Sequence, residues 1–487
     1  MIQKNYLFIG LLTCILFSGY SQVLVNDINK NTGTNDANGA LRGSSPKNFI
    51  EFNNEIYFLA SDTIPVLFEL FKNTGDDMFS LSDSLGLEDN LLPTERRKSI
   101  EEITVFKDSI FFLYRDKLYK TDGVSILDEV PLNRPVTITT PEPISRIMYL
   151  TVFRDKLYFR GFTTGSGTEL FAYSDGQVSM VPEIRNVNQG TESFKAENLI
   201  ATSSTLYYQK QNQDRWWSYT GTGDPKLVGG KSFTELFDYI VYKDQLYFAA
   251  MSTATLGSFS KQEELVLTVN SSNVIEIPNG LNTVFNVFEL GIYKNRLVLE
   301  GDFVTFTKSE PFLGFYNGST LSRVSKTGFY KSRSYQENND TLYFTAGENG
   351  TNDFELWRYV DGNTPEKVFN INPLGNSLPQ DLFSFNNNLF FSANDGETGR
   401  ELWAIGPDYQ SGITGFFDFG KKKSKLMVYP NPADHILHTW KGQVTIVNTM
   451  GEIVLQQYSE GEIDISYLPI GTYSITNGKR TEKIVIQ

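Results

Sequence analysis

The chain has 487 residues, which is too long for one ordinary compact core and predicts several domains or an array of repeats. Aromatic residues make up 14% of the chain, and together with frequent polar turn residues they favour many short strands. The formal net charge of −14 repels phosphate backbones, so we expect no nucleic acid partner.

Residues 1–21 have the pattern of an export signal. Lys4 precedes an apolar run of twelve residues, which falls short of the roughly 20 needed to cross a bilayer. Small residues at Gly19 and Ser21 fit a signal-peptidase site, so cleavage is expected between Ser21 and Gln22. The mature chain would then carry no transmembrane segment.

The middle of the chain repeats one pattern eight times: an apolar strand, a polar turn and a strand resembling "LYF". The repeats recur about every 48 residues, the length of four short strands with their turns. Such strands without intervening helices exclude βαβ units and predict a β-propeller of eight blades, or seven if residues 230–279 form no full blade. A straight β-solenoid is the alternative. The repeats are 52–61, 106–114, 153–161, 202–210, 242–250, 293–301, 337–346 and 385–393.

The start of the mature chain is expected to close the ring. The eighth unit has no outer strand of its own before the glycine-containing linker begins. Residues 23–29 (VLVNDIN) match the outer-strand pattern of residues 367–372 (KVFNIN) and have no preceding blade. Pairing of this first strand with the last blade would cover an exposed sheet edge.

A further strand and turn complete the better preserved units. It reads ELFKNTG at 69–75, KLYKTDG at 117–123, ELFAYSDG at 169–176, ELWRYVDG at 355–362 and ELWAIGPD at 401–408. These motifs resemble a bacterial family of ELWxxDGT-repeat propellers, and the resemblance covers residues 22–408. It implies a propeller and does not imply an enzyme.

Several residues in the repeats have chemically active side chains. A glutamate recurs at one repeat position, as Glu69, Glu169, Glu355 and Glu401, which favours a structural role because a catalytic carboxylate is needed only at one place. Trp216 and Trp217 together resemble a sugar-stacking platform. Trp217 aligns with the core aromatic of other units, which leaves Trp216 as the candidate ligand contact, although core filling is the favoured interpretation.

We predict no cofactor, no metal site and no catalytic residue. The only cysteine, Cys14, lies in the export signal, so the mature chain has no thiol. Histidine occurs only at His435 and His438, outside the repeats, and their spacing places them on opposite faces of a strand. Asp-rich turns such as residues 394–397 lack the alternating register of a calcium loop.

Residues 426–487 form a separate small β-domain after a linker at 409–425, with alternating strands typical of an Ig-like sandwich. The segment resembles the type A C-terminal sorting domain of the type IX secretion system. The matching residues are Tyr429, Pro430, Asn431, Pro432, Gly451, Leu468, Gly471, Tyr473 and Lys483. The resemblance implies contact with the type IX secretion machinery, removal of the domain near the linker, and release or attachment at the outer cell surface.

The sequence leaves three functions open. The first is a monomeric, non-enzymatic propeller, secreted or held at the cell surface, that binds a protein or glycan through one face. The second is an enzyme acting on polysaccharide with carboxylate, Tyr or Arg chemistry in the channel. The third is a structural surface component. The absence of Cys and His from the repeats favours the first.

Overall fold

The computed structural model contains two compact units, Met1–Gly415 and Phe416–Gln487, and each has its own core. The residues that it describes are 22–29, 43–62, 67–74, 78–87, 99–125, 127–134, 142–165, 167–181, 196–210, 215–230, 235–256, 259–270, 273–276, 284–304, 309–324, 329–348, 351, 353–373, 375–407, 435–438, 442–448, 453–459, 462–476 and 481–486.

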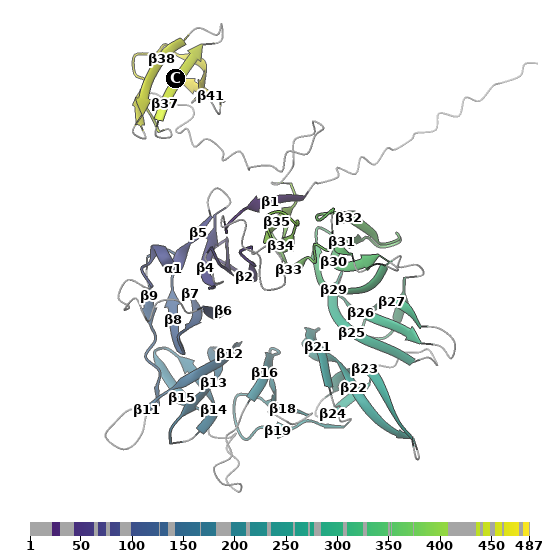
Figure 1. The fold of residues 1–487 in the computed structure, drawn as a ribbon. Coiled ribbons are helices and arrows are strands. Elements are labelled where there is room, and N and C mark those ends of the chain that lie inside the picture. The colour runs from purple at the N-terminus through teal and green to yellow at the C-terminus, as the bar shows by residue number, and fades with distance from the viewer. Residues whose placement is uncertain are drawn as a thin grey trace, which may run out of the picture. The chain divides into compact units, whose positions relative to one another are not determined.

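The described part of the first unit forms eight sheets of four or five strands. In each sheet one strand lies nearest the centre of the ring, and these inner strands are β2, β6, β12, β16, β21, β25, β29 and β33 (Figure 1). The first four sheets are β2 (Lys47–Phe52), β3 (Glu55–Ala60), β4 (Glu69–Asn73) and β5 (Met78–Ser80); β6 (Ile100–Phe106), β7 (Ser109–Tyr114), β8 (Lys117–Thr121) and β9 (Leu127–Glu129); β12 (Ser145–Phe153), β13 (Lys156–Thr163), β14 (Gly167–Ser174) and β15 (Gln177–Met180); and β16 (Ala196–Ala201), β17 (Leu206–Lys210), β18 (Trp216–Tyr219) and β19 (Lys226–Leu227).

The fifth unit, which the sequence left uncertain, folds as a five-stranded sheet. It comprises β20 (Gly229–Gly230), β24 (Asn273–Glu276), β23 (Phe259–Asn270), β22 (Gln245–Leu256) and β21 (Glu235–Tyr242), with β20 parallel to β24. The next sheets are β25 (Val284–Tyr293), β26 (Arg296–Val304), β27 (Ser309–Tyr316) and β28 (Leu321–Arg323); β29 (Phe329–Asn338), β30 (Thr341–Glu348), β31 (Phe354–Tyr359) and β32 (Glu366–Phe369); and β33 (Gln380–Phe385), β34 (Asn388–Asn394) and β35 (Arg400–Ile405) with β1 (Gln22–Asn26).

Two small elements are not part of these eight sheets. Helix α1 (Leu81–Ser84) follows β5, and its N-cap Ser80 accepts a hydrogen bond from the backbone N–H of Asp83. Strands β10 (Asn133–Arg134) and β11 (Glu142–Pro143) form a two-stranded ribbon after β9.

Tight hairpins join each inner strand to the next strand. Asn53 and Asn54 both have positive φ, at 51° and 60°, and Asn386 and Asn387 repeat this geometry at 47° and 63°. Asparagine tolerates this region, which two-residue hairpin turns require. The "LYF" strands that follow, such as β3 and β34, are buried on both faces, because each packs between two neighbouring sheets.

The hydrophobic cores show that the sheets form a closed ring. Each of eight clusters joins one sheet to the next around the ring. In the last cluster Phe390 and Leu402 of the final sheet pack with Ile56 and Phe58 of the first. A solenoid would leave its end sheets apart, so this alternative is wrong and the predicted β-propeller class is confirmed.

The N-terminal strand closes the ring as the sequence predicts. Strand β1 pairs antiparallel with β35, with Val23 opposite Ala404 and Leu24 opposite Trp403. Figure 1 shows β1 beside β35 at the rim of the ring. The outer edge of the last sheet is therefore covered by the beginning of the chain.

The second unit is a small pair of sheets around one core. Its strands are β36 (Ile436–His438) paired with β39 (Glu462–Asp464), and β38 (Ile453–Ser459), β37 (Gly442–Asn448), β40 (Gly471–Thr476) and β41 (Thr481–Ile486) in that order across the larger sheet. The core contains residues of both sheets, including Leu437, Ile463, Ile446 and Ile475. No helix in the described part of the chain is long and apolar enough to cross a membrane.

Candidate functional site

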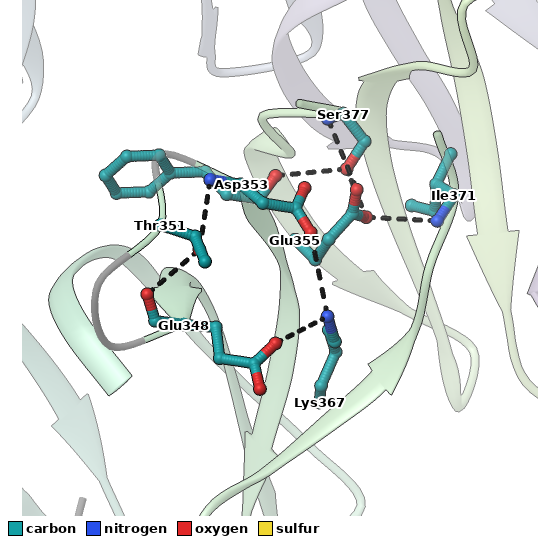
Figure 2. Close-up of polar contacts among 8 residues, drawn as sticks. Glu348, Thr351, Asp353, Glu355, Lys367, Ile371 and Ser377 are labelled. Atoms are coloured by element: carbon teal, nitrogen blue, oxygen red, sulfur yellow. Dashed lines mark hydrogen bonds and ion pairs between the residues drawn. The ribbon is translucent and has the colours of Figure 1, made fainter. Parts of the chain in front are cut away.

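The recurring glutamates hold backbone segments in place. In Figure 2 the carboxylate of Glu355 lies between Ile371 and Ser377. Its oxygens accept hydrogen bonds from the backbone N–H of Ile371 at 3.0 Å and of Ser377 at 3.3 Å, and from the Ser377 hydroxyl. Glu355 is fully buried, and these contacts fix the segment that leads from the seventh sheet to the eighth. We call this group the internal clasp.

Glu401 makes the same contacts with the beginning of the chain. Its carboxylate accepts hydrogen bonds from the backbone N–H of Ile28 at 3.1 Å and of Ser44 at 2.8 Å, and from the Ser44 hydroxyl. We call this group the closing clasp. Burial raises the pKa of Glu355 and of Glu401 to about 7 each.

The other two glutamates of this repeat position also have structural surroundings. Glu69 accepts a hydrogen bond from the Ser80 hydroxyl at 2.6 Å, and Glu169 is buried at 5% exposure. Buried or hydrogen-bonded carboxylates at the same position in four sheets are parts of the scaffold, the role that their recurrence in the sequence favours. They provide no single reactive site.

The structure places Trp216 in the core, the interpretation that the sequence favours over a ligand contact. Its side chain is 0% exposed and packs between the fourth and fifth sheets, where it meets Phe248 at 5.6 Å between ring centroids. Trp216 occupies the strand position that Leu356 and Leu402 occupy elsewhere, which is buried in each case. A fully buried ring has no face for a ligand, so Trp216 fills the core.

A second set of polar residues lies on the inner strands, and the sequence analysis missed it. Each inner strand has a register irregularity. In each strand one such residue lies four positions before the residue that precedes the hairpin turn. It falls within the irregular stretch in six sheets and directly after it in the fifth and sixth. Five of these residues have positive φ, between 51° and 62°. The eight positions are Asn48, Glu102, Tyr149, Asn198, Asp238, Glu289, Ser334 and Asp381. A polar or acidic residue at this fixed spacing is the signal that could have revealed them.

Acidic residues at these positions connect neighbouring inner strands. Glu102 accepts hydrogen bonds from the backbone N–H groups of Tyr149 and Leu150 at 2.9 and 2.8 Å. Asp238 does the same with Leu290 at 2.8 Å, while its other oxygen accepts from its neighbour Tyr239 at 2.8 Å. The irregular backbone leaves N–H groups without a partner in their own sheet, and the carboxylate of the preceding inner strand accepts their hydrogen bonds.

Glu289 differs from these acids. Within the described residues its carboxyl makes no hydrogen bond, and burial first, then the negative charge of Asp238, raises its pKa to about 7. Arg333, on the next inner strand, opposes this shift. The Arg333 guanidinium lies 5.3 Å from the Phe354 ring centroid, and its buried Nε has no partner among the described residues. The Glu289 carboxyl is therefore a polar group on an inner strand with hydrogen-bonding capacity left, and Arg333 is the cation whose charge acts on it.

No metal centre is found in the described residues: they contain no group of three or more His, Cys, Asp or Glu side chains that could hold an ion. Asp395 instead accepts hydrogen bonds within its own turn, from the backbone N–H groups of Glu397 and Thr398 at 2.8 and 2.7 Å. This is the turn chemistry that the sequence favours over calcium binding.

The predicted sorting residues fall into two groups. Leu468 and Tyr473 are buried at 9% and 7% exposure, Gly471 begins β40, and Lys483 lies in β41 opposite Ser474. Residues 429–432 and Gly451 lie outside the described residues, as do the linker 409–425 and Ser21. Gln22, expected to follow the cleavage site, is the first residue of β1.

Comparison with known proteins identifies the second unit. Residues 427–487 match the family model described as "Secretion system C-terminal sorting domain". The chain thus carries such a domain. No curated protein matches the chain.

Solved structures similar to the chain include several propellers. The β-propeller domain of the Trilobed protease from Pyrococcus furiosus is 11% identical, with 63% of this chain and 94% of that chain covered and a TM-score of 0.36. The WD40 domain of SCAP from fission yeast is 8% identical, with 81% and 99% covered and a TM-score of 0.38. The Dos1 propeller is 11% identical, with 74% and 93% covered and a TM-score of 0.40. The β-propeller assignment rests on the strand pairings and the circle of cores.

Proposed function

We propose that this protein is exported by the type IX secretion system and carries an eight-bladed propeller to the outside of the cell. In this proposal residues 1–21 are removed between Ser21 and Gln22, and the Ig-like tail is removed near the linker 409–425. The propeller is then released as a monomer or held at the outer surface. The observation that supports the export route is the sorting-domain match over residues 427–487.

The cleavage after Ser21 agrees with the position of the closing strand. Gln22 is the first residue of β1 and pairs with Ile405, the last residue of β35. Cleavage at this peptide bond would leave the whole closing strand on the mature chain. The eight sheets joined by eight successive clusters support the blade count.

Export is tested by deleting residues 427–487 and expressing both chains in a bacterium that carries the type IX secretion system. The full chain should reach the medium or cell surface, and mass spectrometry should find it beginning at Gln22 and lacking the tail. The deleted chain should remain in the periplasm. Equal export of both chains would contradict the proposal.

We further propose that the exported propeller binds a protein or glycan near the centre of the ring, through Glu289 and Arg333. The support is that this carboxyl makes no hydrogen bond within the described residues, and that the Arg333 guanidinium on the next inner strand is close enough for its charge to act on it. A neutral carboxyl can donate and accept, as glycan hydroxyls require, and a guanidinium donates to carboxylates or carbonyls.

Polysaccharide cleavage is the second candidate, because Asp238 and Glu289 are acids on adjacent inner strands and the charge of Asp238 contributes to the raised pKa of Glu289. Most glycosidases use a pair of nearby carboxyl groups for catalysis. However, both oxygens of Asp238 accept backbone hydrogen bonds, so only Glu289 is available for chemistry. This asymmetry favours binding.

The two functions separate in one experiment with purified propeller. A glycan array and a panel of polysaccharide hydrolysis assays are run with the parent, Glu289→Gln and the exposed-turn control Asp224→Asn. Binding that is reduced about tenfold by Glu289→Gln alone supports a binding role. Hydrolysis that only Glu289→Gln abolishes supports the enzyme. Silence in both assays would contradict glycan binding and hydrolysis, and would leave a protein ligand or a structural surface role.

A further inference from the structure

The turn before β40 in the sorting unit is shaped by buried groups. The backbone N–H of Leu468 donates to the Ile465 carbonyl at 3.0 Å, and the Tyr473 hydroxyl donates to the Pro469 carbonyl at 2.7 Å. Leu468 and Tyr473 both belong to the core of the unit. A partner protein cannot reach these two side chains in the folded unit, so their contribution is to fix the path of residues 465–470.

The same turn exposes two large apolar side chains. Tyr467 is 58% exposed and Ile470 is 82% exposed, the highest value among the large hydrophobic residues described. They flank the buried Leu468 on either side in the sequence. We call the pair Tyr467 and Ile470 the apolar turn.

Exposed apolar residues are concentrated in this unit. Five of the nine exposed large hydrophobic residues in the described chain belong to it, although it is by far the smaller unit. The four in the first unit lie on separate elements: Val124, Leu227, Ile292 and Phe369. Single exposed apolar residues are ordinary on a soluble protein. In the sorting unit the five lie on β36, on β38 and in the apolar turn, and the turn has the most exposed of them, Ile470.

A second exposed surface of the unit provides a matched comparison. Ile453 and Tyr458 of the edge strand β38 are 61% and 64% exposed. They pair with Val447 and Gln443, which alternate with the core residue Val444 and therefore face away from the core. These two side chains are similar in size and exposure to the apolar turn but lie outside it.

We propose that the apolar turn is the contact by which a receptor protein of the secretion system recognises the folded tail. This inference rests on the proposed export route. In that route the secretion system recognises the sorting domain, which the family match places at residues 427–487. Buried motif residues present the turn, and its exposed side chains make the contact.

The area of the turn favours a receptor over a second copy of the chain. A tyrosine buries about 150–250 Å² when covered, so two side chains fall well short of the roughly 1,200 Å² of a stable interface. A small apolar contact of this kind suits a transient partner that must later dissociate. Two aromatic or aliphatic anchors can still carry most of the binding energy.

The test compares two double variants of the full-length chain in a bacterium with the type IX system. Tyr467→Ser/Ile470→Ser should lower export about tenfold or more while its melting temperature stays within about 2 °C of the parent. The matched control Ile453→Ser/Tyr458→Ser removes as many exposed apolar groups and should be exported normally. Leu468→Ala should lower both the melting temperature and export, because it loosens the core.

Normal export of a folded Tyr467→Ser/Ile470→Ser chain would overturn the inference. Equal loss of export in the matched control would also overturn it, because recognition would then depend on general apolarity or on the β38 surface. If the chain without residues 427–487 is exported normally, the proposed export route itself fails. The deletion therefore distinguishes failure of the route from failure of this contact.

Discussion

The internal clasp and the closing clasp make the same contacts with very different stretches of chain. In both, one carboxylate accepts two backbone N–H groups and a serine hydroxyl. The residue after each serine donates its N–H to the residue before each glutamate, at 2.9 Å in both cases. The partners are 16 and 22 residues apart in the internal clasp and 373 and 357 apart in the closing clasp.

The strand beside each clasp has the same register. Lys367 lies opposite Trp357 and Phe369 opposite Leu356, with an irregularity between the pairs. Leu24 lies opposite Trp403 and Asn26 opposite Leu402, again with an irregularity between them. The N-terminal segment is therefore the outer strand and exit segment of the eighth sheet, placed at the other end of the chain.

The difference lies in the chain entropy that each clasp must overcome. Residues 22–29 join the ring only through their C-terminal side once the proposed cleavage has occurred, whereas residues 366–377 are held at both ends by the seventh and eighth sheets. Release of the closing clasp therefore frees more chain entropy than release of the internal clasp. Identical contacts thus leave the closing clasp as the weaker of the two, and the ring should open there first.

The largest effect is expected from removing the glutamate of each clasp. Glu401→Ala leaves two buried N–H groups and a hydroxyl without acceptors and should cost about 2–4 kcal/mol of unfolding free energy. It should also free residues 22–29, whereas Glu355→Ala should loosen only the segment around Ile371. Hydrogen exchange resolved by segment, with denaturant unfolding, measures both effects.

The comparison fails if the two variants behave alike. Equal protection of residues 22–29 in Glu401→Ala and in the parent would mean that the β1–β35 pairing holds the ring without the clasp. Opening of residues 22–29 in Glu355→Ala would mean that the clasps are coupled through the eighth sheet.

A smaller effect is expected from Gly43, the residue before Ser44 of the closing clasp. A Cβ on Gly43 would lie 2.3 Å from the backbone N and O of Arg400, so Gly43→Ala must displace backbone and should cost about 1–3 kcal/mol. The matched control is Gly375→Ala in the internal segment, where the nearest atom to a Cβ is 3.8 Å away. Thermal unfolding should show a lower midpoint only for Gly43→Ala. Equal unfolding midpoints of the two variants would show that the backbone around Gly43 can move away from Arg400 at little cost.

Much of this comparison is visible in the sequence. The repeat period predicts the sheets, the match of residues 23–29 with 367–372 predicts the closure, and recurrence of the glutamates predicts their structural role. The serine partners were missed, although Ser-x-Pro precedes the inner strand at both Ser44 and Ser377. This local signal could have revealed both clasps.

The site at Glu289 on the inner strands could not be predicted from the sequence in the same way. Whether a carboxyl is used or free depends on the backbone of the next sheet, some 50 residues away. Asp238 and Glu289 occupy the same repeat position, yet only Asp238 meets an N–H of its neighbour. Trp216 shows the same dependence on a neighbouring sheet, because the residues that bury its ring belong in part to the fifth sheet, which its own repeat does not contain.

The smallest effect concerns a charged difference between the clasps, because Asp27 stands where the internal segment has Asn370. The Asn370 amide, with its nitrogen toward Glu355, donates to Oε1 at 3.2 Å, whereas Asp27 adds to burial in raising the pKa of Glu401.

Since burial raises the pKa of Glu401 from 4.5 to about 7, the folded chain binds more protons between these values. Its contribution to stability is complete below about pH 4.5 and is lost as pH rises through about 7, at up to about 1.4 kcal/mol per pH unit. Asp27→Asn should lower the pKa of Glu401 and reduce this loss, by less than about 1 kcal/mol between pH 5 and 8. Denaturant unfolding at intervals across that range, with Asp353→Asn as the equivalent change beside Glu355, measures it. A parent chain whose stability rises over the same range would show that both carboxyls are charged in their clasps.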